Sequence, residues 1–370
     1  MSRARDFADL AGSADAGGLT GRNLIINGAM QVAQRGGSAT TVSSSTETFS
    51  VDRFFGRGVG SAGVFTVEQS TTSPEGFSNS SKVTVTTADS SIGATNAYQF
   101  TQRIEGQNSY WLDWGNSSAK TATLSFYVRS SLTGTFGGCI RNSAFNRFHP
   151  FSYTISSADT WERKTVVVSG DTTGTWLTTN GIGVEVAFSL GAGSSRLNTA
   201  GSWTASTSEG ASGQVNLIST NSSTWYITGV QLELGSQATP FEHRSYGDEL
   251  ARCKRYFERF ERQRPGAGSA GTTSLWAGPA RSGASNVQGP MHYVEKRNNP
   301  TISVSSAGHL NAIYPISPFN AALSGFGIDG NAGTQSAYIN ATGSGSPGSD
   351  CASFVYIGDA AGYLDVDAEL

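Results

Sequence analysis

The sequence contains few of the residues on which enzymes and disulfide-stabilised proteins depend. Only 3 of its 370 residues are cysteines, and Cys139, Cys253 and Cys351 lie far apart without a CxxC spacing. This spacing supports neither a disulfide framework nor a cysteine-rich metal site. The 4 histidines are scattered, and GxSxG, HExxH and Walker motifs are absent. We therefore expect a protein that is not an enzyme and that holds neither a metal nor a cofactor.

Charge and long apolar runs are also scarce. Charged residues make up 14% of the chain, and the formal net charge is -3. The sequence lacks the basic excess that a nucleic-acid partner would require. No apolar stretch of a signal peptide follows the first residues, and no window has the length of a membrane span. We expect neither nucleic-acid binding nor membrane insertion, and release by lysis if the protein acts outside a cell.

Glycine, serine and threonine separate short segments in which apolar and polar residues alternate, and 46 residues are glycines. Alternation with a period of two predicts half-buried strands, here joined by tight turns. The fold class is therefore mainly β, and the spacing is typical of a jelly roll or β-sandwich. The predicted strands are Val64–Gln69, Lys82–Thr87, Ala97–Glu105, Ala122–Arg129, Gly134–Arg141, Ser152–Ile155, Arg163–Val168, Gly183–Phe188, Val215–Ser219 and Trp225–Leu234.

One amphipathic helix is predicted over 245–262. Ser245, followed three residues later by Asp248, has the form of a capping box. Apolar side chains then recur at spacings of four and three and form a seam: Tyr246, Leu250, Cys253, Phe257 and Phe260. The seam has two interpretations. It packs against the sandwich, or it forms a short threefold bundle in which Leu250, Phe257 and Phe260 are oligomer contacts.

The remaining residues predict a smaller C-terminal β-domain, either a compact sandwich or a trimeric knob. Its predicted strands are Thr301–Ser305, Ala312–Tyr314, Ala337–Ile339, Ala352–Ile357 and Tyr363–Leu370. We therefore divide the chain into an N-terminal arm and linker (1–21), a jelly-roll sandwich (22–244), a connecting helix (245–264) and a C-terminal tip domain (265–370).

Residues 229–235 contain the "GVQLE-G" run, which continues into "ATPFE-RSYG-EL" over 238–250. This junction resembles the one in bacteriophage tail-fibre and related virion appendage proteins. Residues 23–36, an apolar strand run, resemble "N-LINGAM-V-QRG", residues 51–55 resemble "VDRW", and the last residues resemble "-FDAEL". The resemblance implies a virion protein, assembled in the host cytoplasm, with a jelly-roll domain like that of carbohydrate-binding modules.

The resemblance extends to the N-terminus, where the family often begins with "SRAR-ADL". Residues 2–12 form a candidate amphipathic helix with Phe7 and Leu10 on one stripe. We expect Arg5, Phe7 and Leu10 to dock the protein on other virion proteins of the tail or neck. A frayed terminus is the alternative. The apolar seam and the glycine-rich tip favour a homotrimer.

Aromatic residues in polar loops are the candidates for glycan binding, because planar rings stack on the apolar faces of sugars. The candidates are Tyr110, Trp111, Asp113, Trp114, Trp176 and Trp276. Core packing is the alternative for each ring. A glycosidase would need two carboxylates at a defined separation, and Glu105, Asp113, Glu162, Glu185 and Glu233 are available, but none belongs to a cleft-like motif.

These observations lead us to expect a tail-fibre subunit that attaches to the particle by its N-terminus and adsorbs to a host-surface glycan. A head-decoration or other structural virion protein without receptor function is the first alternative. A polysaccharide depolymerase is the second alternative.

Overall fold

A computed structural model of the chain describes residues 21–43, 45–60, 62–261, 273–280, 286–314, 319–328, 330–343, 351–359 and 361–370. The fold is mainly β, as predicted, and has two compact units. The first comprises the described residues up to Leu250 together with Leu370, and the second comprises Ala251–Glu369. Residues Arg5, Phe7 and Leu10 of the predicted arm lie outside the described residues. Among the described helices, none has both the length and the apolar character to span a membrane.

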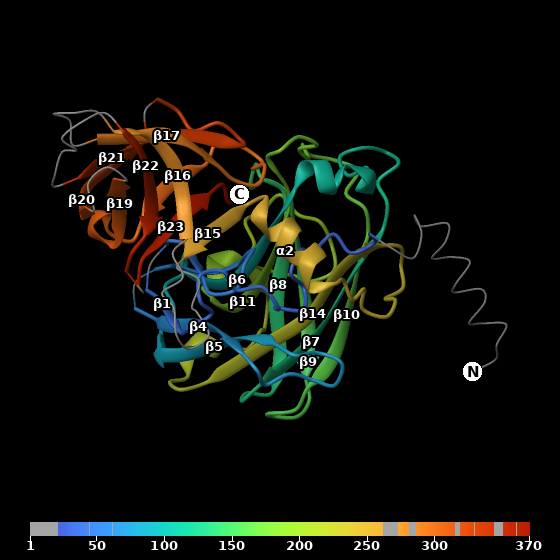
Figure 1. Ribbon diagram of the computed structural model, residues 1–370. Coiled ribbons are helices and arrows are strands. Elements are labelled where there is room, and N and C mark those ends of the chain that lie inside the picture. Colours follow the sequence, from blue (N-terminus) through green and yellow to red (C-terminus); the bar gives the residue numbers. More distant parts are fainter. Residues whose placement is uncertain are drawn as a thin grey trace. The chain divides into compact units, whose positions relative to one another are not determined.

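Two six-stranded sheets make up the first unit (Figure 1). Sheet A has the order β1 (Thr40–Val42), β4 (Val64–Ser70), β5 (Ser80–Thr87), β14 (Thr224–Leu234), β7 (Ala122–Ser130) and β10 (Glu162–Val168). Sheet B has the order β2 (Thr48–Phe49), β3 (Phe54–Val59), β6 (Ala97–Glu105), β11 (Ile182–Ala192), β8 (Gly134–Arg141) and β9 (Phe148–Ile155). Every pairing within these two sheets is antiparallel. The predicted β-sandwich is confirmed.

The core lies between the two sheets, because the strands turn every second side chain inward. Phe126 of sheet A contacts Phe188 of sheet B with ring centroids 5.0 Å apart, and Phe100 lies 5.9 Å from Trp225. All four side chains are buried. Burial of each large ring stabilises the fold by roughly 2–3 kcal/mol. The alternation in the sequence therefore predicts correctly which side chains lie on the inner faces of the sandwich.

Two strand predictions in this unit are wrong. Residues 215–219 are not a strand, because Leu217–Ser219 form a 3-10 turn, η4, that buries both Leu217 and Ile218. A half-buried strand would turn one of two consecutive side chains outward. The predicted strand run 23–36 is also outside both sheets. Its amide groups bond to side chains as well as to backbone, as described below.

Between β11 and η4 lie three short elements, η3 (Ser194–Arg196), β12 (Leu197–Asn198) and β13 (Gly210–Ala211). We call the segment 194–214 the strap. Glu209 of the strap bonds to Gln99 and to Arg141 on the outer face of sheet B. The strap therefore covers the part of the outer face of sheet B around Gln99 and Arg141.

The second unit contains a closed barrel and a three-stranded sheet. The barrel order is β16 (Thr273–Ala280), β17 (Asn286–His292), β21 (Ser336–Gly343), β20 (Phe319–Ile328), β19 (Leu310–Tyr314) and β22 (Cys351–Ile357). The sheet order is β15 (Phe257–Glu261), β23 (Tyr363–Asp367) and β18 (Thr301–Val304), and η5 (Ala307–His309) precedes β19. The prediction of a C-terminal β-domain is confirmed. The prediction of a sandwich there is wrong, because hydrogen bonding of β22 to β16 closes the sheet on itself. The predicted strand Tyr363–Leu370 is shorter than expected, because β23 ends at Asp367.

The predicted helix is shorter than expected. Helix α2 spans Tyr246–Lys254, and its predicted cap is confirmed, because the Asp248 amide donates to Ser245 Oγ over 3.2 Å. Residues 257–261 form β15 instead of a further helical turn, because their backbone groups bond along β23. The spacing of three between Phe257 and Phe260 places both rings on one face of a helix but on opposite faces of a strand, so the pairing with β23 overrides the local pattern.

Candidate functional site

Four loops meet at one end of the sandwich. Three of them, residues 106–121, 142–147 and 169–181, connect β6 to β7, β8 to β9 and β10 to β11. They lie at the same end because β6 ends opposite the start of β11, β8 ends opposite the start of β9, and β10 ends opposite the start of β7. The loop 199–206 is tied to β9 by a β-bridge. We call this surface the loop end. It contains most of the predicted glycan-binding aromatics.

Three tryptophans close the core at the loop end. Ring centroids of Trp114 and Trp176 are 4.8 Å apart, those of Trp114 and Trp203 are 5.2 Å apart, and those of Trp176 and Trp203 are 5.3 Å apart. All three pairs meet edge to face, the geometry that the ring quadrupoles favour. Each indole N–H donates to a backbone carbonyl, of Lys120, Thr173 and Ser169 respectively. Each loop that contributes a tryptophan is therefore anchored by its ring.

His149 of β9 extends this cluster beneath the surface. Its ring lies 5.0 Å from that of Trp203, and its side chain is buried. Burial lowers the pKa of His149 to about 4, because a charged imidazolium is costly away from water. The imidazole is uncharged at neutral pH and packs as an aromatic ring.

Backbone contacts hold the loops close together. The amides of Gly106 and Gln107 donate to the carbonyls of Gly181 and Thr179, over 2.8 and 2.9 Å. Gly115 has a φ of 91°, and a Cβ there would lie 2.9 Å from the Gly174 carbonyl oxygen. Only glycine allows this backbone angle and this approach without strain. The loop end is therefore a packed framework.

The 3-10 turn η2 (Tyr110–Leu112) displays two neighbouring rings on this framework. Tyr110 is 57% exposed and Trp111 is 37% exposed, with ring centroids 5.8 Å apart, while Leu112 is buried in the core. Asp113 ends the turn in the left-handed conformation, with φ 54°. The next ring, that of Trp114, then points into the core. We call the pair Tyr110 and Trp111 the aromatic shelf.

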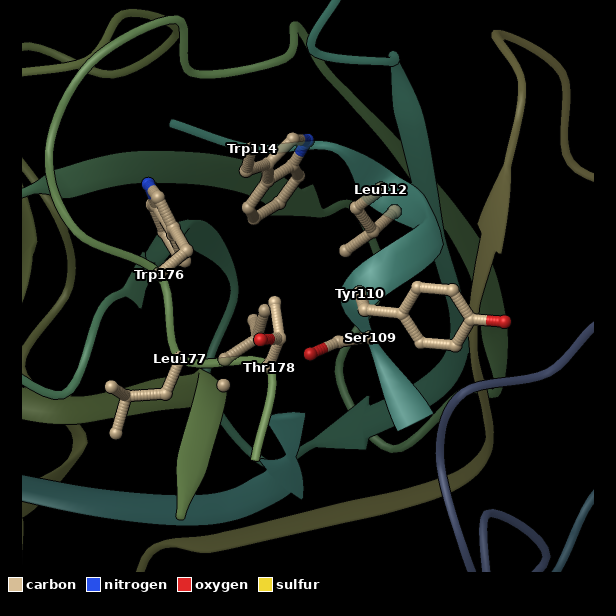
Figure 2. Close-up of a pocket in the computed structure, with 9 residues that line it drawn as sticks. Ser109, Tyr110, Leu112, Trp114, Trp176, Leu177 and Thr178 are labelled. Atoms are coloured by element: carbon tan, nitrogen blue, oxygen red, sulfur yellow. The ribbon is translucent and has the colours of Figure 1, made fainter. Parts of the chain in front are cut away.

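A small cavity of about 20 Å³ lies beside η2 (Figure 2). Trp114, Trp176 and Leu112 line it, whereas the Tyr110 ring points away from it. Sites for small-molecule ligands have volumes of roughly 300 Å³ or more. A sugar could therefore bind at the loop end on the exposed ring faces but not in this cavity.

The charged side chains of the loop end are paired. Arg147 donates from Nε and Nη2 to the two carboxylate oxygens of Asp171, both over 2.7 Å, and Asp171 is buried. This carboxylate raises the pKa of Arg147 above its ordinary value, mainly through the side-chain hydrogen bond. Lys120 Nζ lies 3.6 Å from Asp113 Oδ2 and donates to the Trp111 carbonyl over 3.0 Å.

The structure separates the predicted glycan-binding residues into surface and core. Tyr110 and Trp111 are exposed, and Asp113 and Trp176 are partly exposed. Trp114 is 5% exposed and belongs to the sandwich core, while Trp276 is 4% exposed and belongs to the core of the second unit. A ring with both faces covered cannot stack on a sugar, so Trp114 and Trp276 have structural roles.

The predicted oligomer contacts also differ in exposure. Leu250 is partly exposed, Phe257 is 1% exposed, and Phe260 packs against the core of the second unit. The continuous helical seam is absent, because α2 ends at Lys254. Phe257 is therefore inaccessible to a second chain in this fold.

Sequence reasoning missed Phe145 and Trp203. Phe145 is 45% exposed in the loop 142–147, and its ring lies 4.9 Å from the guanidinium carbon of Arg141. Both residues have small and polar sequence neighbours, as Trp176 does in its loop. Their position at the loop end depends on how the strands pair, and the local sequence does not specify that pairing.

The carboxylates that a glycosidase could use are engaged in the fold. Glu185 bonds to Arg141 and Arg103 under the strap. Burial alone would raise the pKa of Glu185, but these two cations outweigh it, and the net pKa is lowered. Glu233 bonds to Thr239, Glu162 bonds to Lys164, and Glu105 is buried. Over the described ranges, no group of three or more His, Cys, Asp or Glu side chains could hold a metal.

Comparisons with known proteins find likeness in structure alone. No family model and no curated protein sequence matches the chain. The enzymatically active domain of tailspike protein 4 from bacteriophage CBA120 is 16% identical, with a TM-score of 0.27, and the match covers 58% of this chain and 21% of that chain. This chain thus spans about a fifth of that tailspike chain.

Sugar-binding proteins are also among the structural neighbours. A putative sugar binding protein from Bacteroides thetaiotaomicron is 15% identical, with a TM-score of 0.34, and the match covers 58% of this chain and 100% of that chain. A family 11 carbohydrate-binding module from Clostridium thermocellum, in complex with a mixed-linked tetrasaccharide, is 13% identical, with a TM-score of 0.27, and the match covers 52% and 91%. At these identities and TM-scores, none of the three assigns a site to this chain.

Proposed function

We propose that this protein is a virion appendage subunit of the tail-fibre class, which binds a host-surface glycan through the loop end without cleaving it. The observation that carries the proposal is the aromatic shelf, Tyr110 and Trp111, held on a packed framework at the end of the sandwich. Two neighbouring exposed rings with polar surroundings are the usual means of holding the apolar face of a sugar.

The rigidity of the loop end supports this binding role. Trp114, Trp176 and Trp203 anchor three of the four loops from below. A site that is ordered before binding loses less conformational entropy when the ligand arrives. Single protein–sugar contacts are nevertheless weak, on the order of millimolar, so several copies on one particle would supply avidity.

The engaged carboxylates favour binding over cleavage. Hydrolysis of a glycosidic bond needs two carboxyl groups on either side of an open cleft. Glu185 and Glu233 are buried and bonded, and Asp113 lies beside Lys120 on the surface. A bound glycan would therefore remain intact.

The virion role is supported by the sequence motifs in the first and the last segments of the sandwich domain. Residues 23–28 and 230–249 bond to each other through side chains that belong to the resembling runs. These motifs therefore contribute to the framework of the domain, and the loop end lies outside them. We propose that residues 1–20 dock the subunit on the particle through Arg5, Phe7 and Leu10.

Adhesion to bacterial cells tests the glycan-binding role. We expect fluorescently labelled protein to adhere to at least one strain of a panel and to compete with infection. The double variant Tyr110→Ala/Trp111→Ala should lose adhesion. Tyr246→Ala is the matched control, because Tyr246 is also 57% exposed but lies on α2, outside the loop end, and it should adhere normally.

Two outcomes would favour the alternatives. Adhesion to no strain would favour a head-decoration or other structural virion protein. Release of reducing ends from cell-surface polysaccharide would establish a depolymerase. Deletion of residues 1–20 tests the docking role separately, since it should abolish incorporation into particles and leave the thermal transition of the sandwich unchanged.

A further inference from the structure

The loop end is almost free of net charge. Its four loops, 106–121, 142–147, 169–181 and 199–206, contain only four charged side chains, two acidic and two basic. These form the two pairs described above, Arg147 with Asp171 and Lys120 with Asp113. No guanidinium or ammonium group of these loops is left without a carboxylate neighbour. The buried His149 adds no charge at neutral pH.

From this arrangement we infer that the aromatic shelf accepts uncharged glycans, that is, chains of neutral hexoses or deoxyhexoses without carboxylate or phosphate groups. The inference rests on the proposed glycan-binding function. It restricts the proposed ligand of the loop end from host-surface glycans in general to uncharged glycans.

An anionic sugar would have to compete with a carboxylate for each cation of these loops, with Asp171 for Arg147 and with Asp113 for Lys120. Binding of a carboxylate or phosphate favours the planar fork of a free arginine. In Arg147 that fork is occupied by Asp171, whose carboxylate is 2% exposed. Withdrawing Arg147 toward a ligand would leave this buried carboxylate unpaired, which costs free energy. The Arg147–Asp171 pair therefore maintains the loops and does not recruit anions.

Apart from the Lys120–Asp113 pair, the exposed polar groups beside the shelf are uncharged donors and acceptors. Asn116, Ser117, Thr172 and Thr178 are exposed on the loops that flank the rings. Hydroxyl and amide groups both donate and accept hydrogen bonds, as the hydroxyls of a neutral sugar do. The exposed rings can stack on the apolar face of a neutral sugar, and the hydroxyl and amide groups around them can bond to its hydroxyls.

Affinity electrophoresis of the full-length protein tests the inference. The gels contain one of three neutral polymers, dextran, mannan or galactomannan, or one of two polyanions, alginate or hyaluronate. We expect retardation by at least one neutral polymer, with an affinity that changes by less than about two-fold between about 50 and about 500 mM NaCl, because salt screens only charged contacts. The polyanions should cause no retardation.

Variants assign the binding to the shelf. Trp111→Ala should weaken retardation by the neutral polymer about ten-fold or more, since it removes a stacking face. Trp111→Phe should restore part of the affinity, and Tyr246→Ala should behave like the unmodified protein. A merely structural role for Trp111 would change the thermal transition as well, which the same variants measure.

The possible failures are distinguishable. Retardation by a polyanion alone, dependent on Trp111 and falling steeply with salt, would overturn the inference and leave the proposed function intact. Retardation that is insensitive to Tyr110→Ala and Trp111→Ala would overturn both the inference and the assignment of the site. Retardation by none of the five polymers, with adhesion to cells that a protease abolishes, would indicate a protein receptor and overturn the proposed function as well.

Discussion

At the residue scale, the same side chain has opposite roles within a few positions. Trp111 is exposed on the shelf, and Trp114 closes the core. The reversal between them comes from a short 3-10 turn followed by Asp113 in the left-handed conformation. Asn and Asp adopt that conformation more readily than most residues. A polar loop in the sequence therefore does not distinguish a binding ring from a packing ring.

His149 predicts a pH dependence of stability. Its pKa is lowered from 6.5 to about 4 in the folded protein. Between these two pH values the unfolded chain binds a proton at His149 that the folded chain does not, so stability falls as the pH decreases through this window. The loss is at most on the order of 3 kcal/mol. Thermal unfolding at pH 7 and at pH 4 measures it.

The variant His149→Phe removes the titrating group and keeps a ring beside Trp203. We expect its Tm to fall less between pH 7 and pH 4 than that of the unmodified protein. His292→Gln, a change at an exposed histidine, is the control and should keep the full pH dependence. An equal pH dependence in His149→Phe would contradict the prediction.

At the element scale, the segment 23–28 is held by side chains in place of a strand ladder. Asn23 Oδ1 accepts from the amides of Ile25 and Leu232, over 3.0 and 3.1 Å, and its Nδ2 donates to the Val230 carbonyl. Glu249 accepts from the Asn27 amide over 2.6 Å. These contacts explain why the two sequence motifs occur together in one fold.

We predict that Asn23→Ala destabilises the sandwich by about 3 kcal/mol, because it leaves buried backbone groups of β14 without partners. Chemical denaturation followed by tryptophan fluorescence measures the loss. Asn221→Ala, at an exposed loop position, should change stability by less than about 0.5 kcal/mol. A similar small change in Asn23→Ala would show that water replaces the lost bonds.

The strap gives a second prediction at this scale. Arg141 is fully buried and bonds to both Glu185 and Glu209. Glu209→Gln should cost roughly 3–5 kcal/mol, since it removes the charge that holds the strap to a buried guanidinium. Faster hydrogen exchange over 194–214 should accompany the loss.

Glu68→Gln is the matched control for the strap prediction. It removes a charge from a partly exposed pair with Lys82 on sheet A, where the expected cost is below about 1 kcal/mol. Unchanged exchange of the strap in Glu209→Gln would mean that backbone bonds and packing hold it without the ion pair.

At the scale of the whole molecule, the two units have separate hydrophobic cores. The sandwich core contains Phe126, and the core of the second unit contains Ile339. We predict two calorimetric transitions. Phe126→Ala should lower one transition, and Ile339→Ala should lower the other, each by the equivalent of about 3 kcal/mol. A single transition that both variants lower equally would show that the units unfold together.

The homotrimer stays a prediction at this scale. Several glycan-binding loop ends on one particle would raise the apparent affinity of weak single contacts, and Leu250 is a partly exposed candidate contact. Light scattering of the full-length protein at micromolar concentration measures the mass. A monomer would contradict the prediction, and Leu250→Glu should dissociate a trimer that uses this residue.

The sequence by itself determined the β class, most strands of the sandwich, the cap of α2 and the candidate shelf residues Tyr110 and Trp111. It could do so because alternation and capping are local patterns, which depend on neighbouring residues and not on distant parts of the chain. The run 257–261 marks the limit of such patterns, since the spacing of Phe257 and Phe260 fits a helix face, whereas pairing with β23 makes the run a strand.

Only the tertiary structure decided which rings face water, which charges are paired and where the chain closes into a barrel. Trp203 joins Trp114 because the loop 199–206 bonds to β9 across the sheet. Phe257 is buried because β15 pairs with β23, more than a hundred residues later in the chain. Burial and charge pairing depend on contacts between distant segments, and a local pattern does not specify those contacts.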